Sequence, residues 1–245
     1  MEETIRTLER RAFAAWPALD TVEQDGWALR TANGYTKRAN SANAVEPALQ
    51  PVDLQIARIE AHYRAHDLPP IFRLTPLAGS GIDRALEARG YARIDPSLVM
   101  VARPGSDLRD PQAIDADSPW AGWLDAFIAA TEASPSAAAK LAALLRCIVP
   151  PAQFVQIPDA TNRPAAFAMA VADAGYVGIF EVLSAAHARR QGFARRAVAH
   201  AMAWGFARGA HTAYLQVAAD NAPAMALYAA LGFVPLYGYH YRISP

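Results

Sequence analysis

The apolar positions in the second half of the chain follow strand and helix periods in turn. Residues 176–183 are apolar except for Glu181 and are as many as a buried strand holds, and apolar residues recur at helical spacing over 192–208, until Gly209. The predicted elements are strands at 153–157, 165–172, 176–183 and 212–218, helices at 192–208 and 222–231, and a strand pair within 233–243. Two further helices are predicted before these elements, because Ser118-Pro119 and Ser134-Pro135 each combine an N-capping serine with a proline at the first helical position. This order predicts a mixed α/β sheet.

The first half has a weaker pattern. Asn33-Gly34 predicts a tight hairpin between strands at 26–30 and 35–38, because both central residues of a type I′ turn need positive φ. The other predicted elements are helices at 2–16, 54–66 and 82–89 and strands at 71–74 and 97–101. Residues 103–116 are rich in proline, glycine and aspartate and are typical of a linker. We therefore expect two domains, residues 1–105 and 106–245.

Composition narrows the classes of partner. The chain has 23 basic and 23 acidic residues, which disfavours nucleic acid, whose binding requires a clustered basic surface. The charged N-terminus lacks the apolar core of a signal peptide, and no apolar run reaches the roughly 18–20 residues that span a bilayer. We expect a cytoplasmic protein without a membrane partner. The single cysteine, Cys147, excludes an internal disulfide and a thiolate zinc cluster.

The segment 189–194, Arg-Arg-Gln-Gly-Phe-Ala, leads from an apolar strand into a helix. Gly192 has no Cβ and lets a ligand approach the backbone, while amides at a helix start lack internal partners and face the positive end of the dipole. These features indicate a cradle for a pyrophosphate. A capped helix with a solvated basic first turn fits the same residues, but arginines there oppose the dipole, which favours an anionic guest. The cations available to it are Arg189, Arg190, Arg195 and Arg196.

Two further candidate residues, Asn221 and Tyr228, lie on the next predicted helix. Asn221 follows the strand at 212–218 and is placed to cap the helix that contains Tyr228. The two residues are seven apart, nearly two turns, and so share a face that can turn toward the cradle. From the residues alone, Asn221 can equally be only a cap and Tyr228 only a core aromatic.

Together the two stretches resemble the GNAT superfamily of acetyltransferases over residues 165–242. The motif Arg/Gln-x-x-Gly-x-Gly/Ala is matched by Arg189, Gly192 and Ala194. An asparagine followed by Leu-Tyr-x-x-x-Gly-Phe is matched by Asn221, Leu227, Tyr228, Gly232 and Phe233. The resemblance implies a GNAT fold and acetyl-coenzyme A as co-substrate, with no metal.

The resemblance also assigns residues to roles. It implies that the backbone of residues 182–184 pairs with the pantetheine arm, that the amides of residues 190–195 bind the pyrophosphate, and that Tyr228 is the general acid. The residues implied to bind the cofactor are Val182, Leu183, Ser184, Arg189, Arg190, Gln191, Gly192, Phe193, Ala194, Arg195, Asn221 and Tyr228.

The expected general base departs from the family pattern. Some family members carry a glutamate where this chain has Gln216, whose amide accepts no proton at neutral pH. Glu181 is the best substitute, with a salt-bridged strand-edge carboxylate as the alternative. The catalytic residues expected are Tyr228 and Glu181. His187 precedes the cradle and is a weaker candidate for contact with phosphate or substrate, and His62 and His66 are better explained by a solvated helix face than by a metal site.

The first half resembles a degenerate GNAT copy, as in tandem members of the superfamily. Its strand at 71–74, helix at 82–89, Gly90-Tyr91 and final strand repeat the order found around Gly232-Phe233. It lacks the glycine-containing loop, so we expect it to bind no cofactor; an unrelated α/β cap is the alternative.

The expected function is transfer of an acetyl group from acetyl-coenzyme A to a primary amine, which attacks the thioester directly. The amine is expected to belong to a small molecule that binds in a cleft between the two domains. A protein or peptide N-acetyltransferase and a non-catalytic acyl-coenzyme A sensor are the alternatives. The chain is expected to act as a monomer or a homodimer.

Overall fold

A computed structural model describes residues 1–105, 109–120 and 122–244. The helices are α1 (Glu2–Ala15), α2 (Val52–Ala65), α3 (Gly79–Ala88), α4 (Trp123–Thr131), α5 (Pro135–Arg146), α6 (Phe193–Ala207) and α7 (Ala222–Ala229), with short 3₁₀ turns η1 (Lys37–Ala39), η2 (Pro76–Ala78) and η3 (Ala186–Ala188). The strands are β1 (Asp20–Gln24), β2 (Trp27–Thr31), β3 (Ala42–Ala44), β4 (Ile71–Leu74), β5 (Ala92–Ala102), β6 (Ile114–Ala116), β7 (Ala152–Pro158), β8 (Pro164–Asp173), β9 (Tyr176–Ser184), β10 (Thr212–Ala218) and β11 (Val234–Ile243).

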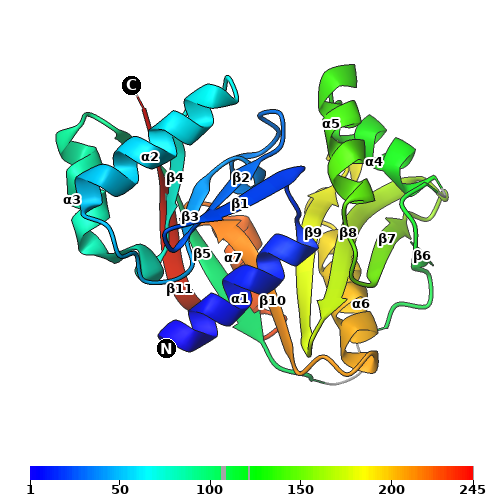
Figure 1. Cartoon of the computed structure of the whole chain (residues 1–245). Helices are drawn as coiled ribbons and strands as arrows, with labels where there is room; N and C mark the ends of the chain where they lie inside the picture. Colours follow the sequence, from blue (N-terminus) through cyan, green and yellow to red (C-terminus); the bar gives the residue numbers. More distant parts are fainter. Residues whose placement is uncertain (106–108, 121, 245) are drawn as a thin grey trace.

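These strands form one eleven-stranded sheet in the order β1-β2-β3-β4-β11-β5-β10-β9-β8-β7-β6 (Figure 1). Neighbours are antiparallel except for the parallel pairs β3·β4 and β10·β9. The predicted mixed α/β sheet is confirmed. No helix of the described residues is long and apolar enough to cross a membrane.

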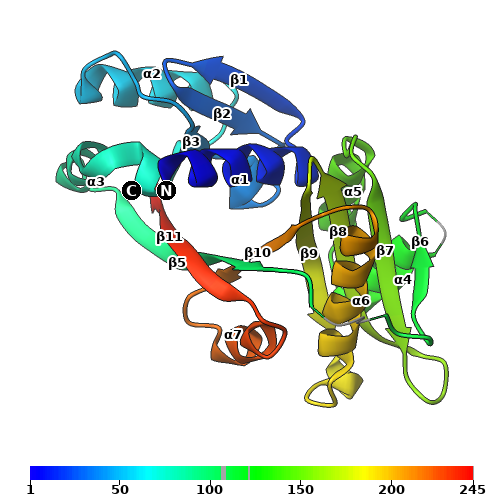
Figure 2. The same cartoon turned by 90° about the horizontal axis from the view of Figure 1, so that it is seen from below.

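The order of elements repeats along the chain. The first half runs β1-β2-β3-α2-β4-α3-β5 and the second runs β7-β8-β9-α6-β10-α7-β11. The last strand of each half inserts beside strands of the other half, because β11 lies between β4 and β5 while β5 lies between β11 and β10 (Figure 2). The register joins Val101 to both Tyr214 and Val234. The two halves therefore share the centre of the sheet.

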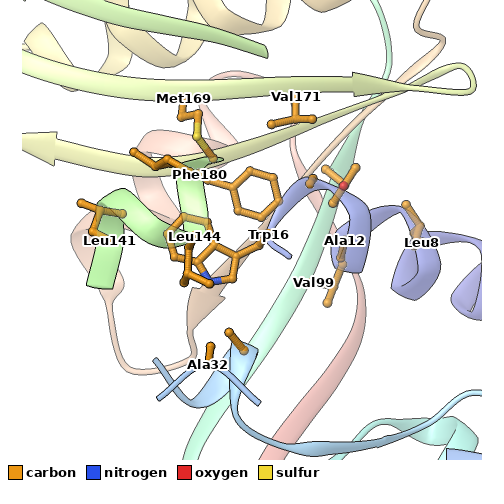
Figure 3. Packing of buried hydrophobic residues seen from close by; sticks show 14 of the residues in the cluster. Leu8, Ala12, Trp16, Ala32, Val99, Leu141, Leu144, Met169, Val171 and Phe180 are labelled. Atoms are coloured by element: carbon orange, nitrogen blue, oxygen red, sulfur yellow. The ribbon is translucent and has the colours of Figure 1, made fainter. Parts of the chain in front are cut away.

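Alternate residues of β8 face two different layers. Phe167 and Met169 pack in a cluster with side chains of α1, α4 and α5, while Ala166 and Ala168 pack in a cluster with α6. The first cluster crosses between the halves, since Trp16, which follows α1, stacks on Phe180 of β9 at a ring-centroid distance of 6.2 Å (Figure 3). The α6 layer is close-packed because its contacts on β8 are alanines.

The hairpin of the first half differs from the prediction. Strands β1 and β2 turn at Asp25-Gly26, whose φ values are 46° and 79°, rather than at Asn33-Gly34. Asn33 and Gly34 also have positive φ, but the Asn40 carboxamide oxygen accepts from the Gly34 amide at 3.0 Å and closes a loop there. The strand predicted at 35–38 is wrong; Lys37–Ala39 is a 3₁₀ turn.

Three further predictions need correction. The helix expected at Ser118-Pro119 begins at Trp123, after Gly122, whose φ of 92° interrupts any earlier helical path, whereas Ser134 caps α5 as predicted. The strand pair expected within 233–243 is the single strand β11, bent by two register shifts. The segment predicted as a linker contains the edge strand β6.

Candidate active site

The parallel strands β9 and β10 separate part-way along their length. Their register runs from Thr212↔Tyr176 to Leu215↔Ile179 and ends there. Beyond this point β9 continues along β8, and β10 continues along β5 (Figure 2). The backbone of residues 180–184 therefore borders a gap on its β10 side. Backbone amides and carbonyls at such a gap are available to an extended ligand.

A cavity of about 430 Å³ opens at this separation. Strands β9 and β10 supply its walls, Tyr228 of α7 closes one side, and residues from the first half cover another. The lining residues are Thr36, Lys37, Arg38, Asp95, Ser97, Ile179, Phe180, Glu181, Val182, Gln216, Val217, Ala218, Tyr228, Tyr239 and Tyr241. The volume is within the range of small-molecule sites.

Glu181 lies at a bulge in β9. The register of β8 and β9 shifts between Phe167 and Met169, and Glu181 has a φ of 48°, in the left-handed region that non-glycine residues rarely adopt. Its side chain is only 16% exposed and lies 3.8 Å from an Nη2 of Arg38. Burial raises the pKa of Glu181, and attraction by Arg38 opposes the rise. A carboxylate with a raised pKa accepts a proton more readily near neutral pH.

Tyr228 faces the same cavity from α7. Tyr228 is 7% exposed, and its ring contacts the Phe233 ring edge-on, with 5.9 Å between the centroids. Burial raises the pKa of the Tyr228 hydroxyl to about 12. The hydroxyl therefore keeps its proton at neutral pH and can donate it.

Asn221 caps α7. Its side-chain oxygen accepts from the Ala224 amide at 3.1 Å, and Ala222-Pro223 opens the helix. The predicted cap is confirmed, and it fixes the start of the helix that presents Tyr228. Contact of Asn221 with a cofactor stays a prediction.

The loop before α6 presents amides that no helical bond uses. The first helical bond joins the Arg196 amide to the Gly192 carbonyl at 3.2 Å, so the amides of residues 193–195 lie ahead of it, and no side chain caps them. Gly192 and Arg190 both have positive φ, 85° and 62°. A Cβ at Gly192 would meet nothing within 4 Å. The geometry suits the approach of an anion to bare backbone.

The charges around this loop divide into two groups. Arg189, Arg190 and Arg195 are exposed. Arg196 instead pairs with Asp110, with its Nε 2.6 Å from Oδ2 and Nη2 3.1 Å from Oδ1. The Arg196 guanidinium is thus held against the segment that enters β6, and its contribution to the phosphate cradle stays a prediction. His187 likewise faces a carboxylate, Asp159, at 3.3 Å.

Several residues that line the cavity belong to no local sequence motif that would have identified them as part of a site. Arg38 belongs to the first half, and Tyr239 of β11 donates its hydroxyl to the Gln216 carboxamide at 3.0 Å. Both reach the site through strand pairing between the halves, which local spacing does not encode. Within the described part of the chain, no three histidine, cysteine, aspartate or glutamate side chains gather as a metal site would require.

Comparison with known proteins assigns the family. The model of the family "Probable histone acetyltransferase Rv0428c C-terminal" matches residues 3–242. The chain belongs to this family of GNAT acetyltransferases. It is an acyltransferase, and GNAT acetyltransferases use acetyl-coenzyme A.

Two relatives and two solved structures illustrate the likeness. The chain is 29% identical to "Uncharacterized N-acetyltransferase YobR" of Bacillus subtilis (strain 168) over 249 residues, 99% of each protein. It is 30% identical to "Probable histone acetyltransferase Rv0428c" of Mycobacterium tuberculosis (strain ATCC 25618 / H37Rv) over 226 residues, 87% of this chain and 66% of that protein.

The solved structures share the fold at low identity. A GCN5-related N-acetyltransferase from Kribbella flavida has a TM-score of 0.71 at 20% identity, covering 98% of this chain and 95% of that one. A tandem GNAT protein from the clavulanic acid biosynthesis pathway has a TM-score of 0.65 at 13% identity, covering 97% and 87%. The GNAT-type fold is thereby confirmed.

Proposed function

We propose that this chain transfers an acetyl group from acetyl-coenzyme A to the primary amine of a small molecule by direct attack. The observation that carries the proposal is that Glu181 and Tyr228, a carboxyl and a phenol, line one cavity where β9 and β10 separate. Residues Thr36–Arg38 of the first half cover that cavity, which favours a small acceptor.

The cofactor would lie along the separated strand ends and the start of α6. The backbone of Val182, Leu183 and Ser184 borders the gap that an extended pantetheine arm would fill. The amides of residues 193–195 and the exposed Arg189, Arg190 and Arg195 would hold the pyrophosphate. Asn221 and Tyr228 would meet the cofactor from α7. The free amides and the open space at Gly192 fit such a ligand.

The chemistry needs three proton transfers, two away from the attacking nitrogen and one to the departing sulfur. An alkyl ammonium has a pKa of about 10 and must lose a proton before its nitrogen attacks the thioester carbonyl. Glu181 accepts that proton, directly or through water. As the carbon–sulfur bond breaks, Tyr228 donates its proton to the departing sulfur. The attacking nitrogen loses its second proton at the same stage, and that proton returns through water to the Tyr228 oxygen, so the neutral amide and the free thiol leave together. Amides at the strand ends stabilise the negative charge that develops on the carbonyl oxygen.

We also propose that the first half is a degenerate copy of the second, with residues 1–105 and 106–245 as the two units. The support is the repeated order of three strands, helix, strand, helix and strand, together with the two parallel pairs β3·β4 and β10·β9. In the first half the helix α2 follows Pro51 rather than a glycine loop.

The name of the mycobacterial relative makes a protein lysine the second candidate acceptor. A panel of small amines and lysine peptides, assayed for thiol release from acetyl-coenzyme A, separates the two. Tight acetyl-coenzyme A binding without turnover of either class would contradict the proposal and favour an acyl-coenzyme A sensor.

Glu181→Gln should change the shape of the pH profile: the wild-type rate levels off once Glu181 has lost its proton, whereas the variant's rate keeps rising toward the amine's own pKa of about 10. In the wild type, kcat/KM should rise with pH as Glu181 loses its proton, over a range above that of an ordinary glutamate because its pKa is raised. The variant should be about tenfold slower at pH 7, less than the usual general-base effect, because amine already deprotonated in solution bypasses the base. Steady-state rates from pH 5 to 9 measure this.

The control is Glu23→Gln, the same change on an exposed residue of β1. A measurement of Tm shows whether a slower Glu181→Gln variant has lost a catalytic group or has lost its fold. Because the folded pKa of Glu181 is raised, the stability that its protonation contributes is present below the ordinary glutamate pKa and lost as pH rises through the folded value. Glu181→Gln should therefore keep or raise Tm at neutral pH. A pH profile of unaltered shape would remove Glu181 from the mechanism.

Gly192→Ala should weaken coenzyme A binding about tenfold, equal to about 1.4 kcal/mol. The added Cβ occupies the open space in which the pyrophosphate would approach the backbone. The matched control is Gly209→Ala at the other end of α6, because Gly209 has the same φ of 85° and the same open surroundings. Isothermal titration with coenzyme A compares them. Equal affinities in the two variants would contradict the cradle.

A further inference from the structure

Three arginines of the first half gather behind the active-site cavity. Arg30 of β2 and Arg73 of β4 are 3% and 2% exposed, and Arg38 belongs to η1. All three line a small cavity of about 10 Å³ together with Gln216. Arg38 and Gln216 also line the 430 Å³ cavity, so the two spaces adjoin through these residues.

The buried charges of this cluster do not balance within the described residues. Arg73 pairs with the carboxylate of Glu9, with Nη2 3.1 Å from Oε1. Arg30 donates to the carbonyls of Arg38, at 2.8 Å, and Trp16 but has no carboxylate partner in the described ranges. The Nε atoms of both Arg30 and Arg73 are buried without a hydrogen-bond partner there. Burial and repulsion by Arg73 lower the pKa of Arg30 to about 9. An unpaired buried cation is costly unless an anion approaches.

Arg38 is the member of the cluster that a ligand can reach. Its side chain is 27% exposed on the active-site cavity. Its distance of 3.8 Å from Glu181 is longer than the usual 2.7–2.9 Å or so of a charge-assisted hydrogen bond, so its donors are not committed to that carboxylate. Its guanidinium lies 5.0 Å from the Trp16 ring, which holds it at the cavity wall.

We propose that the acceptor amine carries an acidic group, and that Arg38, backed by the buried Arg30 and Arg73, binds it. The inference rests on the proposed function. The small cavity has room for about one water, so the acidic group lies on the active-site side of Arg38, and the buried arginines stabilise its charge across the short distance between. The ammonium end then faces Glu181. Because Arg38 and Glu181 are neighbours, the substrate is an amino acid whose amine and acid are separated by few bonds.

The test compares amino acids with their carboxamides, which keep the shape and lose the charge. The α-, β- and γ-amino acids and their carboxamides are assayed for thiol release from acetyl-coenzyme A, each at equal concentration of free amine. The wild type should prefer an acid over its carboxamide by about tenfold to a hundredfold in kcat/KM, through KM. In Arg38→Gln this ratio should fall toward one, and Arg38→Lys should restore part of it.

The acid-to-carboxamide ratio of kcat/KM is the decisive readout. Removing Arg38 also changes the surroundings of Glu181, but this change affects the acid and its carboxamide equally and cancels in the ratio. Arg64→Gln on α2 is the matched control, since it removes an exposed cation of the first half that is paired with Glu60 at 2.7 Å and does not line the cavity; its ratio should stay that of the wild type. Equal or better turnover of the carboxamides, or an acid preference kept in Arg38→Gln, would overturn the inference while the acetyltransfer to amines stands. Coenzyme A binding with no thiol release from any amine would overturn both proposals.

Discussion

Tyr228→Phe should lower kcat about 100-fold, at the lower end of the range for loss of a general acid. The variant keeps the ring and its contact with Phe233 and loses only the hydroxyl that lines the cavity. The Kd of acetyl-coenzyme A should change less than about threefold, because the proton is needed in the transition state rather than in the bound state. The rate of thiol release at saturating amine gives kcat, and isothermal titration with acetyl-coenzyme A gives the Kd.

The leaving group provides a sharper test of the role. An acetyl thioester of a more acidic thiol needs less help to depart, so it should recover much of the rate lost in Tyr228→Phe. Tyr176→Phe, a change on β9 at the end far from the strand separation, is the matched control and should leave kcat unchanged. A full rate in Tyr228→Phe, or equal losses with both thioesters, would remove the general-acid assignment.

Glu9→Gln should destabilise the fold by about 3–5 kcal/mol, as expected when one member of a buried ion pair is removed. Glu9 of α1 is 1% exposed; it pairs with Arg73 and accepts from the Tyr237 hydroxyl at 2.6 Å. The change leaves Arg73, like Arg30, as a buried cation with no carboxylate partner among the residues that the structure describes, where α1, β4 and β11 meet. Urea unfolding followed by circular dichroism measures the free energy of unfolding.

Glu3→Gln on the same helix is the control. Glu3 also pairs with an arginine, Arg6, at 2.7 Å, but its side chain is 80% exposed, so its loss should cost less than about 1 kcal/mol. A comparable small loss in Glu9→Gln would show that the buried pair contributes little and that the cluster tolerates excess positive charge without a ligand.

Local patterns predicted the parts of the site that local structure builds. Gly192 marks the start of α6, and Asn221 caps α7 two turns before Tyr228, because a turn and a cap depend on a few adjacent residues. Their relation to one another followed from the family resemblance rather than from spacing. The assigned cofactor contacts stay predictions.

The parts that depend on distant pairing were not predictable. Asp25-Gly26 and Asn33-Gly34 are equally good turn signals, and the choice between them depends on β2 pairing with β3 as well as with β1. Arg38 and Arg73 have no local sequence signal, because strands from both halves bring them to the cavities that they line. The pairing of Arg196 with Asp110 likewise joins residues 86 apart.

The place of β11 in the sheet has a consequence for synthesis on the ribosome. Its final residues pair with β4, joining Ile243 to Ile71 and His240 to Leu74. Until those last residues emerge, β4 and β5 of the nascent chain have open edges where β11 will lie, and open edges invite wrong pairing. Because such long-range pairing forms slowly, the open edges of β4 and β5 persist for an interval after these strands are made, and they close only when β11 has been synthesised and has paired.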